Sequence, residues 1–187
     1  MKVEPTSLAG VVVLTPKRFG DDRGFFSEVW NQRALQEQGI DAAFVQDNHS
    51  LSRDVGVLRG LHCQTPPFAQ DKLVRVARGR ADDVVVDIRK GSPSYGKWIS
   101  VELSAENGAQ IFVPKGCLHG FVTRVPDTEI LYKCSNYYAP DHDVSIRWDD
   151  PGLGIDWGVA ADQVILSDKD RNAMALGDFE NPFVYED

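Results

Sequence analysis

The stretch that decides the fold runs from Gln110 to Cys134 and reads QIFVPKGCLHGFVTRVPDTEILYKC. It contains short runs rich in β-branched or aromatic residues, and turn-forming residues separate them. The runs are Gln110–Val113, Gly120–Arg124 and Glu129–Cys134, and the turns are Pro114-Lys115-Gly116 and Pro126-Asp127. Short strands at this spacing are typical of a β-sandwich or a β-barrel.

The same pattern continues toward the N-terminus, where helix signals are few. Asn31 can cap a helix over Gln32–Gln38, and Gly39 can end it. A second short helix is expected after Asp168. No repeat, low-complexity tract or linker interrupts the chain, so we predict one all-β barrel domain over residues 1–187 with short peripheral helices. The further predicted strands are Val11–Leu14, Val57–Leu61, Leu73–Ala77, Val84–Ile88 and Trp98–Leu103.

Composition narrows the classes of partner. The 187 residues include 28 acidic and 20 basic side chains, a formal charge of −8. This charge repels phosphate at long range, so we expect neither nucleic acid nor a membrane as partner. No apolar run approaches the roughly 20 residues that cross a bilayer, and the N-terminus lacks a signal peptide's apolar region. Cys63, Cys117 and Cys134 form no CxxC pair, which favours a reducing compartment, so the expected location is the cytoplasm.

A histidine, an arginine and a lysine lie on two successive predicted strands. Arg59 and His62 are three residues apart, so on a regular strand they face opposite ways. Gly60 between them can host a β-bulge that turns one of them. Lys72 opens the next strand, and its side chain can then meet theirs inside a barrel. Without the bulge only one of the pair points inward, and a lone histidine is usually structural.

A second motif surrounds His119. Pro114-Lys115-Gly116, two residues and then His119 match the second short motif of cupin barrels. Metal-binding cupins carry His-x-His and a downstream Glu in the first motif, but here His62 is followed by Cys63-Gln64-Thr65. A metal site needs at least three well-placed ligands, so we predict none. His119 is then either a hydrogen-bonded barrel residue or a ligand contact.

Two further features have structural interpretations when each is taken alone. Tyr132 shares a strand face with Ile130 and Cys134, which is typical of a core tyrosine. Ser167-Asp168-Lys169-Asp170 is typical of a solvated helix start, with Ser167 or Asp168 as the cap.

In chain order, however, these stretches resemble the dTDP-4-dehydrorhamnose 3,5-epimerase family from near Pro5 to near Ala175. The resemblance implies a cupin-type β-barrel (jelly roll) and a reaction that needs no metal or cofactor. It also implies a homodimer in which an N-terminal strand typically pairs with the partner's sheet. The matching segments are Asp22–Glu28, Gln46–Ser50, Gly56–His62, Pro66-Pro67 with Gln70, Lys72–Val76, Gly91–Gly96, Pro114–Phe121, Tyr132-Lys133, Ile146–Trp148, Asp150-Pro151 and Leu166–Asp170.

The resemblance also implies roles for residues. The implied reaction is epimerisation at C3 and C5 of dTDP-4-keto-6-deoxyglucose, whose ketone acidifies the hydrogens on both carbons. His62 corresponds to the general base, Asp170 to its orienting carboxylate, Tyr132 to the general acid, and Lys72 to the group facing the ketone. We expect Asp170 to raise the His62 pKa modestly above 6.5. The implied substrate contacts are Arg23, partly in the other subunit's pocket, Glu28, Gln46, Asn48, Arg59, Lys72, His119 and Lys169.

One departure and several alternatives remain at this stage. The family usually carries Glu where Asp143 stands, so a nucleotide contact there is expected to be lost or bridged by water. The same residues would serve an enzyme that epimerises one carbon only, or a keto-isomerase. A sugar-nucleotide-binding cupin without catalysis would not need His62, Asp170, Tyr132 and Lys72 together. A metal cupin dioxygenase would require bound metal.

Overall fold

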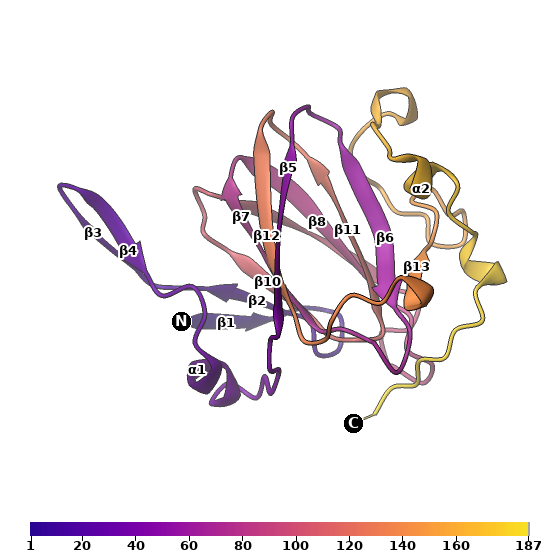
Figure 1. The fold of residues 1–187 in the computed structure, drawn as a ribbon, viewed down its shortest axis with the longest axis horizontal. Helices are drawn as coiled ribbons and strands as arrows, with labels where there is room; N and C mark the ends of the chain where they lie inside the picture. Colours follow the sequence, from indigo (N-terminus) through magenta and orange to yellow (C-terminus); the bar gives the residue numbers. More distant parts are fainter. Residues whose placement is uncertain (187) are drawn as a thin grey trace.

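Two facing antiparallel sheets form the body of the protein, a cupin-like jelly roll, as the sequence predicts (Figure 1). The computed structural model describes residues 1–186. One sheet has six strands in the order β1-β2-β10-β7-β12-β5, and the other has five in the order β13-β6-β11-β8-β9. The strands are β1 Lys2–Pro5, β2 Val12–Thr15, β3 Arg18–Asp21, β4 Gly24–Ser27, β5 Gln46–Ser52, β6 Leu58–Gln64, β7 Lys72–Arg78, β8 Arg80–Asp87, β9 Trp98–Ser104, β10 Gln110–Val113, β11 Cys117–Thr123, β12 Thr128–Cys134 and β13 Asp143–Ser145.

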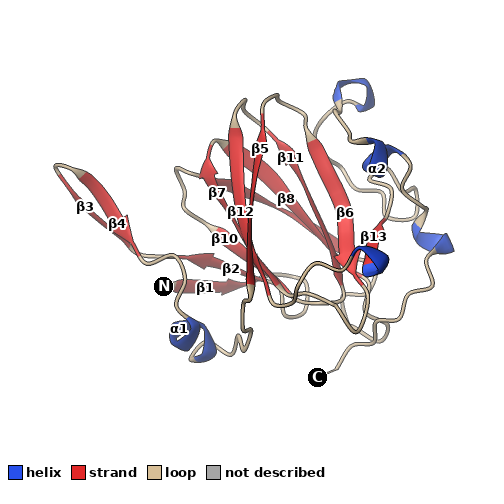
Figure 2. Ribbon diagram, viewed as in Figure 1, coloured by secondary structure: helices blue, strands red, loops and turns tan. Residues whose placement is uncertain are grey.

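The helices are short and lie at the periphery (Figure 2). Helix α1 spans Gln32–Gln36, and the Asn31 side chain accepts a hydrogen bond from the Ala34 amide at 3.2 Å, so the predicted cap is confirmed. Helix α2 spans Asp168–Arg171, with Ser167 as its cap. Among the described residues no helix has the length and apolar character needed to cross a membrane. The 3-10 turns are η1 Pro140–His142, η2 Ala161–Gln163 and η3 Leu176–Asp178.

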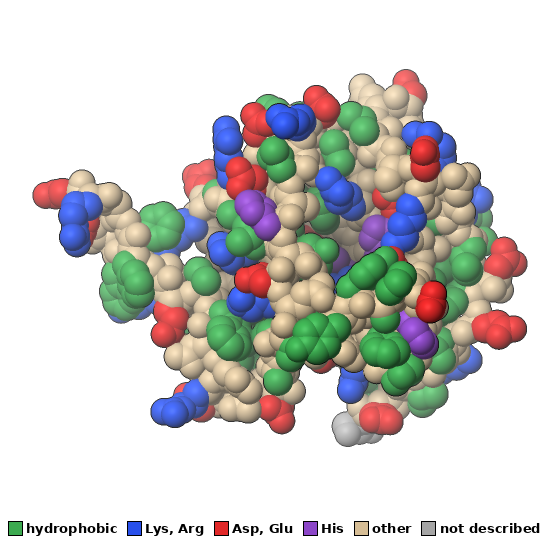
Figure 3. Space-filling view, in the orientation of Figure 1, with side chains coloured by type: hydrophobic (Ala, Val, Ile, Leu, Met, Phe, Trp, Pro, Cys, Tyr) green, Lys and Arg blue, Asp and Glu red, His purple; other side chains and the backbone are tan. Residues whose placement is uncertain are grey.

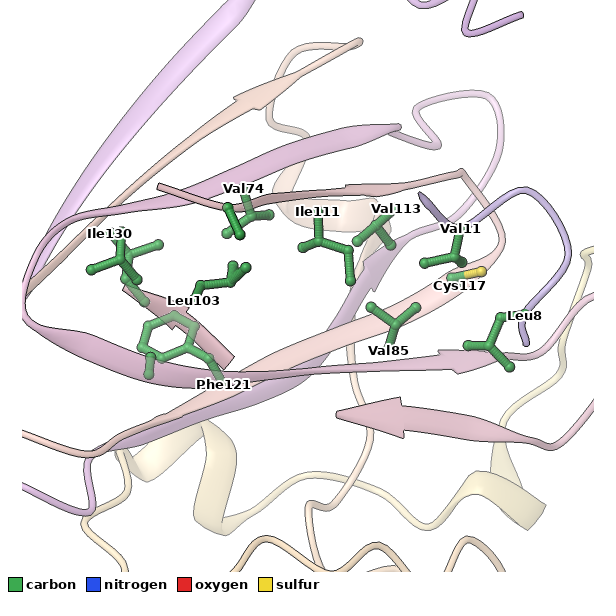
Figure 4. Close-up of a cluster of buried hydrophobic side chains, with 13 residues drawn as sticks. Leu8, Val11, Val74, Val85, Leu103, Ile111, Val113, Cys117, Phe121 and Ile130 are labelled. Atoms are coloured by element: carbon green, nitrogen blue, oxygen red, sulfur yellow. The ribbon is translucent and has the colours of Figure 1, made fainter. Parts of the chain in front are cut away.

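An apolar core fills one part of the space between the sheets (Figure 4). Val74, Ile111 and Ile130 from the six-stranded sheet meet Val85 and Phe121 from the five-stranded sheet, and all five are buried. Two further apolar clusters lie on the outer faces. The C-terminal segment covers the outside of the five-stranded sheet, and α1 packs outside the six-stranded one. Burial on both faces makes the sheets a rigid support for side chains that point inward.

The β-bulge that Gly60 can host is present. Across β6 and β11, His119 pairs with His62 and Phe121 pairs with Arg59, so two steps on β11 match three on β6. Gly60 has a φ of +135°, and a Cβ there would lie 2.6 Å from the Gly120 Cα. The extra residue therefore turns Arg59 and His62 to the same, inner face.

Candidate active site

Polar side chains gather at the part of the barrel interior that the apolar core leaves free. On the six-stranded sheet, Tyr132 lies opposite Asn48 on β5, and Lys72 lies opposite Cys134. Alternation places Lys72, Tyr132 and Asn48 on the same face as the core residues Val74 and Ile130. In the space-filling view, basic and histidine side chains border a hollow between β5 and β6 (Figure 3).

His62 and Asp170 form a tight pair at the wall of this cavity. The Nε2 atom of His62 lies 2.5 Å from Asp170 Oδ1, and Asp170 is only 3% exposed. Ser167 Oγ donates to the other carboxylate oxygen at 2.7 Å and accepts from the Asp170 amide at 3.1 Å. Ser167, the cap of α2, thus positions the Asp170 carboxylate, which in turn positions the His62 ring. Within residues 1–186, His62 Nδ1 has no hydrogen-bond partner.

The electrostatics of this pair differ from expectation in one respect. Burial by itself would raise the pKa of Asp170, but hydrogen bonds from His62 and Ser167 outweigh it and lower that pKa. Asp170 is therefore an ionised acceptor, and Nε2 of His62 is the donor. The pKa of His62 is lowered below 6.5, because burial outweighs the attraction to Asp170 and because Lys169 and Lys72 oppose protonation. The prediction of a modestly raised pKa was wrong: it omitted the cost of desolvating the ring.

Tyr132 faces the cavity from the opposite sheet. Burial raises the pKa of its phenol above 10, so the hydroxyl is protonated at neutral pH. Arg59 and the Asn48 side chain act in the other direction and lower it in part. Tyr132 and Asn48 are direct register partners on β12 and β5, so their side chains lie on the same face of the sheet. Tyr132 is partly buried and packs against the core, as expected of a core tyrosine.

Arg59 and Lys72 supply positive charge close to these groups. The Arg59 guanidinium bridges toward β5, with Nη2 donating to the Leu51 carbonyl at 3.3 Å. Lys72 is half-buried on β7, and its charge acts on both His62 and Cys134. Gln46 donates to Asn48 at 3.1 Å and accepts from the Tyr138 amide at 2.9 Å, which orders this edge of the cavity.

A second histidine–carboxylate pair lies beside the first. His119 is buried, and its Nε2 lies 3.0 and 2.9 Å from the two oxygens of Asp83 on β8. His119 is thus a hydrogen-bonded barrel residue, and a ligand contact stays a prediction. Asp83 is not among the predicted site residues, although an acidic residue at an inward position between Ala81 and Val85 could have indicated it.

Asp143 and Lys169 meet at the cavity edge. Lys169 Nζ lies 2.5 Å from Asp143 Oδ2, and the Tyr138 hydroxyl donates to the same oxygen at 3.0 Å. The hydrogen bond to Asp143 is the largest cause of a raised pKa of the Tyr138 phenol. This network joins β13, α2 and the loop before η1. Asp143 therefore already has two partners from its own chain.

Two predicted contacts are not brought to this cavity. Arg23 is at the tip of the β3–β4 hairpin, which projects away from the barrel, and its partner is Asp21 (Figure 1). Glu28 follows the hairpin and accepts from Asn31 at 3.1 Å. Phe19, Phe25 and Phe26 on the hairpin are 55%, 62% and 70% exposed, so they are not core residues of this chain.

A cupin-like barrel with a carboxylate-held imidazole and a facing phenol defines a class of protein, acid–base enzymes of the cupin type. Comparison with known proteins makes the assignment specific. The family described as dTDP-4-dehydrorhamnose 3,5-epimerase matches residues 5–178, and the chain belongs to this family. Its members are isomerases that act as epimerases.

Individual relatives agree with this membership. The dTDP-4-dehydrorhamnose 3,5-epimerase of Sinorhizobium fredii is 48% identical over 99% of this chain and 94% of its own length. That of Pseudomonas aeruginosa is 49% identical over 95% of this chain and 97% of its own. The Legionella pneumophila enzyme RmlC, solved in complex with dTDP-4-keto-L-rhamnose, is 43% identical and covers 100% of this chain and 99% of its own, with a TM-score of 0.94.

Proposed function

We propose that this chain epimerises dTDP-4-keto-6-deoxyglucose at C3 and C5 to dTDP-4-keto-rhamnose, a step of dTDP-rhamnose biosynthesis. The observation that carries this proposal is the placement of His62, held by Asp170, and the protonated Tyr132 on facing sheets of one cavity. Inversion at a carbon next to a ketone requires a base on one face of the sugar ring and an acid on the other.

Each inversion is a balanced pair of proton transfers. His62 Nδ1 takes the proton from the carbon, and the electrons of the C–H bond move toward the ketone to give an enolate. The Lys72 ammonium stabilises the charge on that oxygen, a contribution typically worth roughly 10²–10³ in rate. Tyr132 then delivers its proton to the opposite face and the ketone re-forms. His62 ends with one proton more and Tyr132 with one fewer, so exchange with water must reset both.

The cations around the cavity suit a nucleotide diphosphate on a chain whose net charge is −8. Arg59 and Lys169 are the candidates for the phosphates, because Arg59 offers a bidentate fork and Lys169 a point charge. Gln46, Asn48 and His119 are candidates for the sugar and the base. Asp143 is occupied by Lys169 and Tyr138, which supports the expectation that its own nucleotide contact is lost or bridged by water.

The hairpin supports a homodimer. Its three exposed phenylalanines form an apolar surface that water disfavours, and a second copy of the chain would cover it. The same docking would bring Arg23 and Glu28 to the partner's cavity. Neither residue lies at the cavity of its own chain. β1 pairs with its own β2, and its other edge stays open to a partner's sheet. Analytical ultracentrifugation tests this: a dimer is expected, and a monomer at working concentration would refute it.

We also propose that residues 1–187 act as one domain in the cytoplasm. Cys63, Cys117 and Cys134 are free and buried, which suits a reducing compartment.

Incubation with dTDP-4-keto-6-deoxyglucose in D₂O, followed by proton NMR, tests the reaction. Deuterium at both C3 and C5 is expected. Label at one carbon only would instead support the single-carbon alternative, which has a precedent in ChmJ, a 3'-monoepimerase from Streptomyces bikiniensis at 34% identity and a TM-score of 0.85. Binding of dTDP without any exchange would indicate a sugar-nucleotide-binding protein.

A further inference from the structure

The Asp83–His119 pair lies in the barrel interior, where burying a carboxylate costs free energy. Asp83 is 0% exposed, and its inward-facing neighbours on β8, Ala81 and Val85, belong to the apolar core. Taking a carboxylate out of water costs several kcal/mol, and apolar side chains of similar volume often replace a buried ion pair with no loss of stability. Stability alone therefore does not explain a carboxylate at this position.

The position of His119 suggests what the carboxylate is for. β11 lies between β6 and β8, so His119 has His62 directly opposite on one side and Asp83 on the other. Side chains directly opposite on neighbouring strands have Cβ atoms roughly 5 Å apart, close enough for two imidazoles to bond to each other. Asp83 instead holds Nε2 of His119 with both oxygens, and within residues 1–186 Nδ1 makes no hydrogen bond.

We propose that Asp83 is a positioning residue for the epimerisation: it fixes the proton of His119 on Nε2 and so presents Nδ1 to the sugar beside the base. This inference rests on the proposed function. The anchored ring stays clear of His62, which keeps the lone pair of the base free, and Nδ1 remains available to a sugar hydroxyl. Asp83 itself does not touch the substrate.

The chain contains its own matched control. Asp82 precedes Asp83 on β8, faces the other side of the sheet and pairs with Arg124 at 2.6 Å. Asp82→Asn and Asp83→Asn each remove one charge from the same strand, and each breaks an ion pair. Only the second change disturbs His119, so a difference between the two variants reports on that ring and not on general damage to β8.

Two measurements test the proposal. The chain has four histidines, so the ring ¹⁵N resonances of His119 can be assigned by substituting His49, His62 and His142 one at a time. In the wild type we expect His119 protonated on Nε2, and in Asp83→Asn we expect its ring shifts to change. kcat/KM for the keto sugar should fall about 10- to 100-fold, the range for residues that orient a functional histidine in metal sites. The Kd for dTDP, which lacks the sugar, should stay within about twofold, and Asp82→Asn should change neither quantity.

A wild-type His119 protonated only on Nδ1 would overturn the inference, even if no variant folds. A folded Asp83→Asn that keeps its kcat/KM, or that matches Asp82→Asn in every readout, would overturn it as well. Failure of the proposed function is a separate result, because the wild type itself would then show no deuterium exchange.

Discussion

Asp170 and Asp87 are both buried carboxylates that accept hydrogen bonds from a basic side chain and from serine. The two carboxylates differ in what their basic partners can do. Asp170 binds His62 and Ser167 beside the cavity. Asp87 binds Arg89, Ser92 and Ser94 at the far end of β8. Arg89 never loses its proton, whereas an imidazole can.

The surroundings of the two basic partners also differ. Arg89 and Ser94 bond onward to the carbonyl and amide of Ala9, so the Asp87 cluster ties the segment before β2 to the five-stranded sheet. Among the residues that the structure describes, His62 instead makes a hydrogen bond through only one ring nitrogen. In the proposed mechanism, the carboxylate of Asp170 serves catalysis because its partner can release a proton into the cavity, whereas that of Asp87 serves architecture because its partner cannot.

The largest effect is expected from Asp170→Asn. The variant no longer enforces the proton on Nε2 or stabilises the imidazolium, so the rate of solvent exchange at the sugar carbons should fall about 10²–10⁴-fold. Proton NMR in D₂O measures this rate. Asp168→Asn is the control, because that side chain is 93% exposed on the same helix, and it should leave exchange unchanged. Equal losses in both variants would remove Asp170 from the mechanism.

Asp87→Ala should affect stability and not chemistry. It leaves the buried Arg89 charge without its partner, which typically lowers the free energy of unfolding by about 3–5 kcal/mol. Urea titration measures the change, and the exchange rate per folded molecule should match the wild type. Asp149→Ala is the comparison, because its pair with Arg147 is half-exposed and typically worth less than about 1 kcal/mol. A loss that small for Asp87→Ala would refute the architectural role.

The Asp87 cluster should also make the stability of the protein depend on pH in the acid range. Hydrogen bonds from Arg89, Ser92 and Ser94 outweigh the opposing effect of burial and hold the Asp87 pKa at about 2, against 3.8 ordinarily. A lowered pKa contributes stability that is present above pH 3.8 and is lost as the pH falls through about 2, here about 2 kcal/mol. We therefore expect the unfolding free energy of the wild type to fall by this amount across the window, and that of Asp87→Asn to lack this decrease. An identical pH slope in both proteins would contradict it.

The sequence predicts the barrel and most of its strands, because the core strands are short apolar runs between clear turns. It does not predict β5, whose QDNHSLS pattern is polar at almost every position. One face of that strand lines the cavity, so its residues do not follow the apolar pattern of a core strand. The β3–β4 hairpin was not predicted either, because its apolar residues do not belong to the core of this chain and are exposed.

Some features of the candidate site could be predicted from the sequence, and others could not. His62, Lys72, Tyr132 and Asp170 lie more than 100 residues apart at the extremes, and resemblance to a family collected them where spacing alone could not. Alternation showed that Arg59 and His62 can share a face only through a bulge such as Gly60 can host, but it left open whether the bulge forms. The lowered pKa of His62 did not follow, because burial is a property of the folded cavity.

Gly60→Ala tests the device that turns His62 inward. Its Cβ would meet the Gly120 Cα at 2.6 Å, a backbone contact that cannot yield without moving β11. We expect a loss of about 1–3 kcal/mol in stability and a lower exchange rate in the folded fraction. Gly91→Ala is the control, because its φ is also positive, at +86°, but nothing lies within 4 Å of the new Cβ. If the two variants behave alike, backbone strain and not the close approach explains the glycine.

The smallest effect concerns the acid limb of kcat/KM. Only unprotonated His62 can act as the base, and burial lowers its pKa, so the midpoint of the limb should lie below 6.5. Asp170 opposes this shift, so Asp170→Asn should move the midpoint of its residual activity lower still. The free energy of unfolding should change in the same direction as the activity. The contribution of His62 is complete above pH 6.5 and is lost as the pH falls toward the lower pKa of the folded state. A wild-type midpoint above 6.5 would mean that attraction to Asp170 outweighs desolvation, and His62 would then resemble the permanently charged partner of Asp87 more closely than this structure indicates.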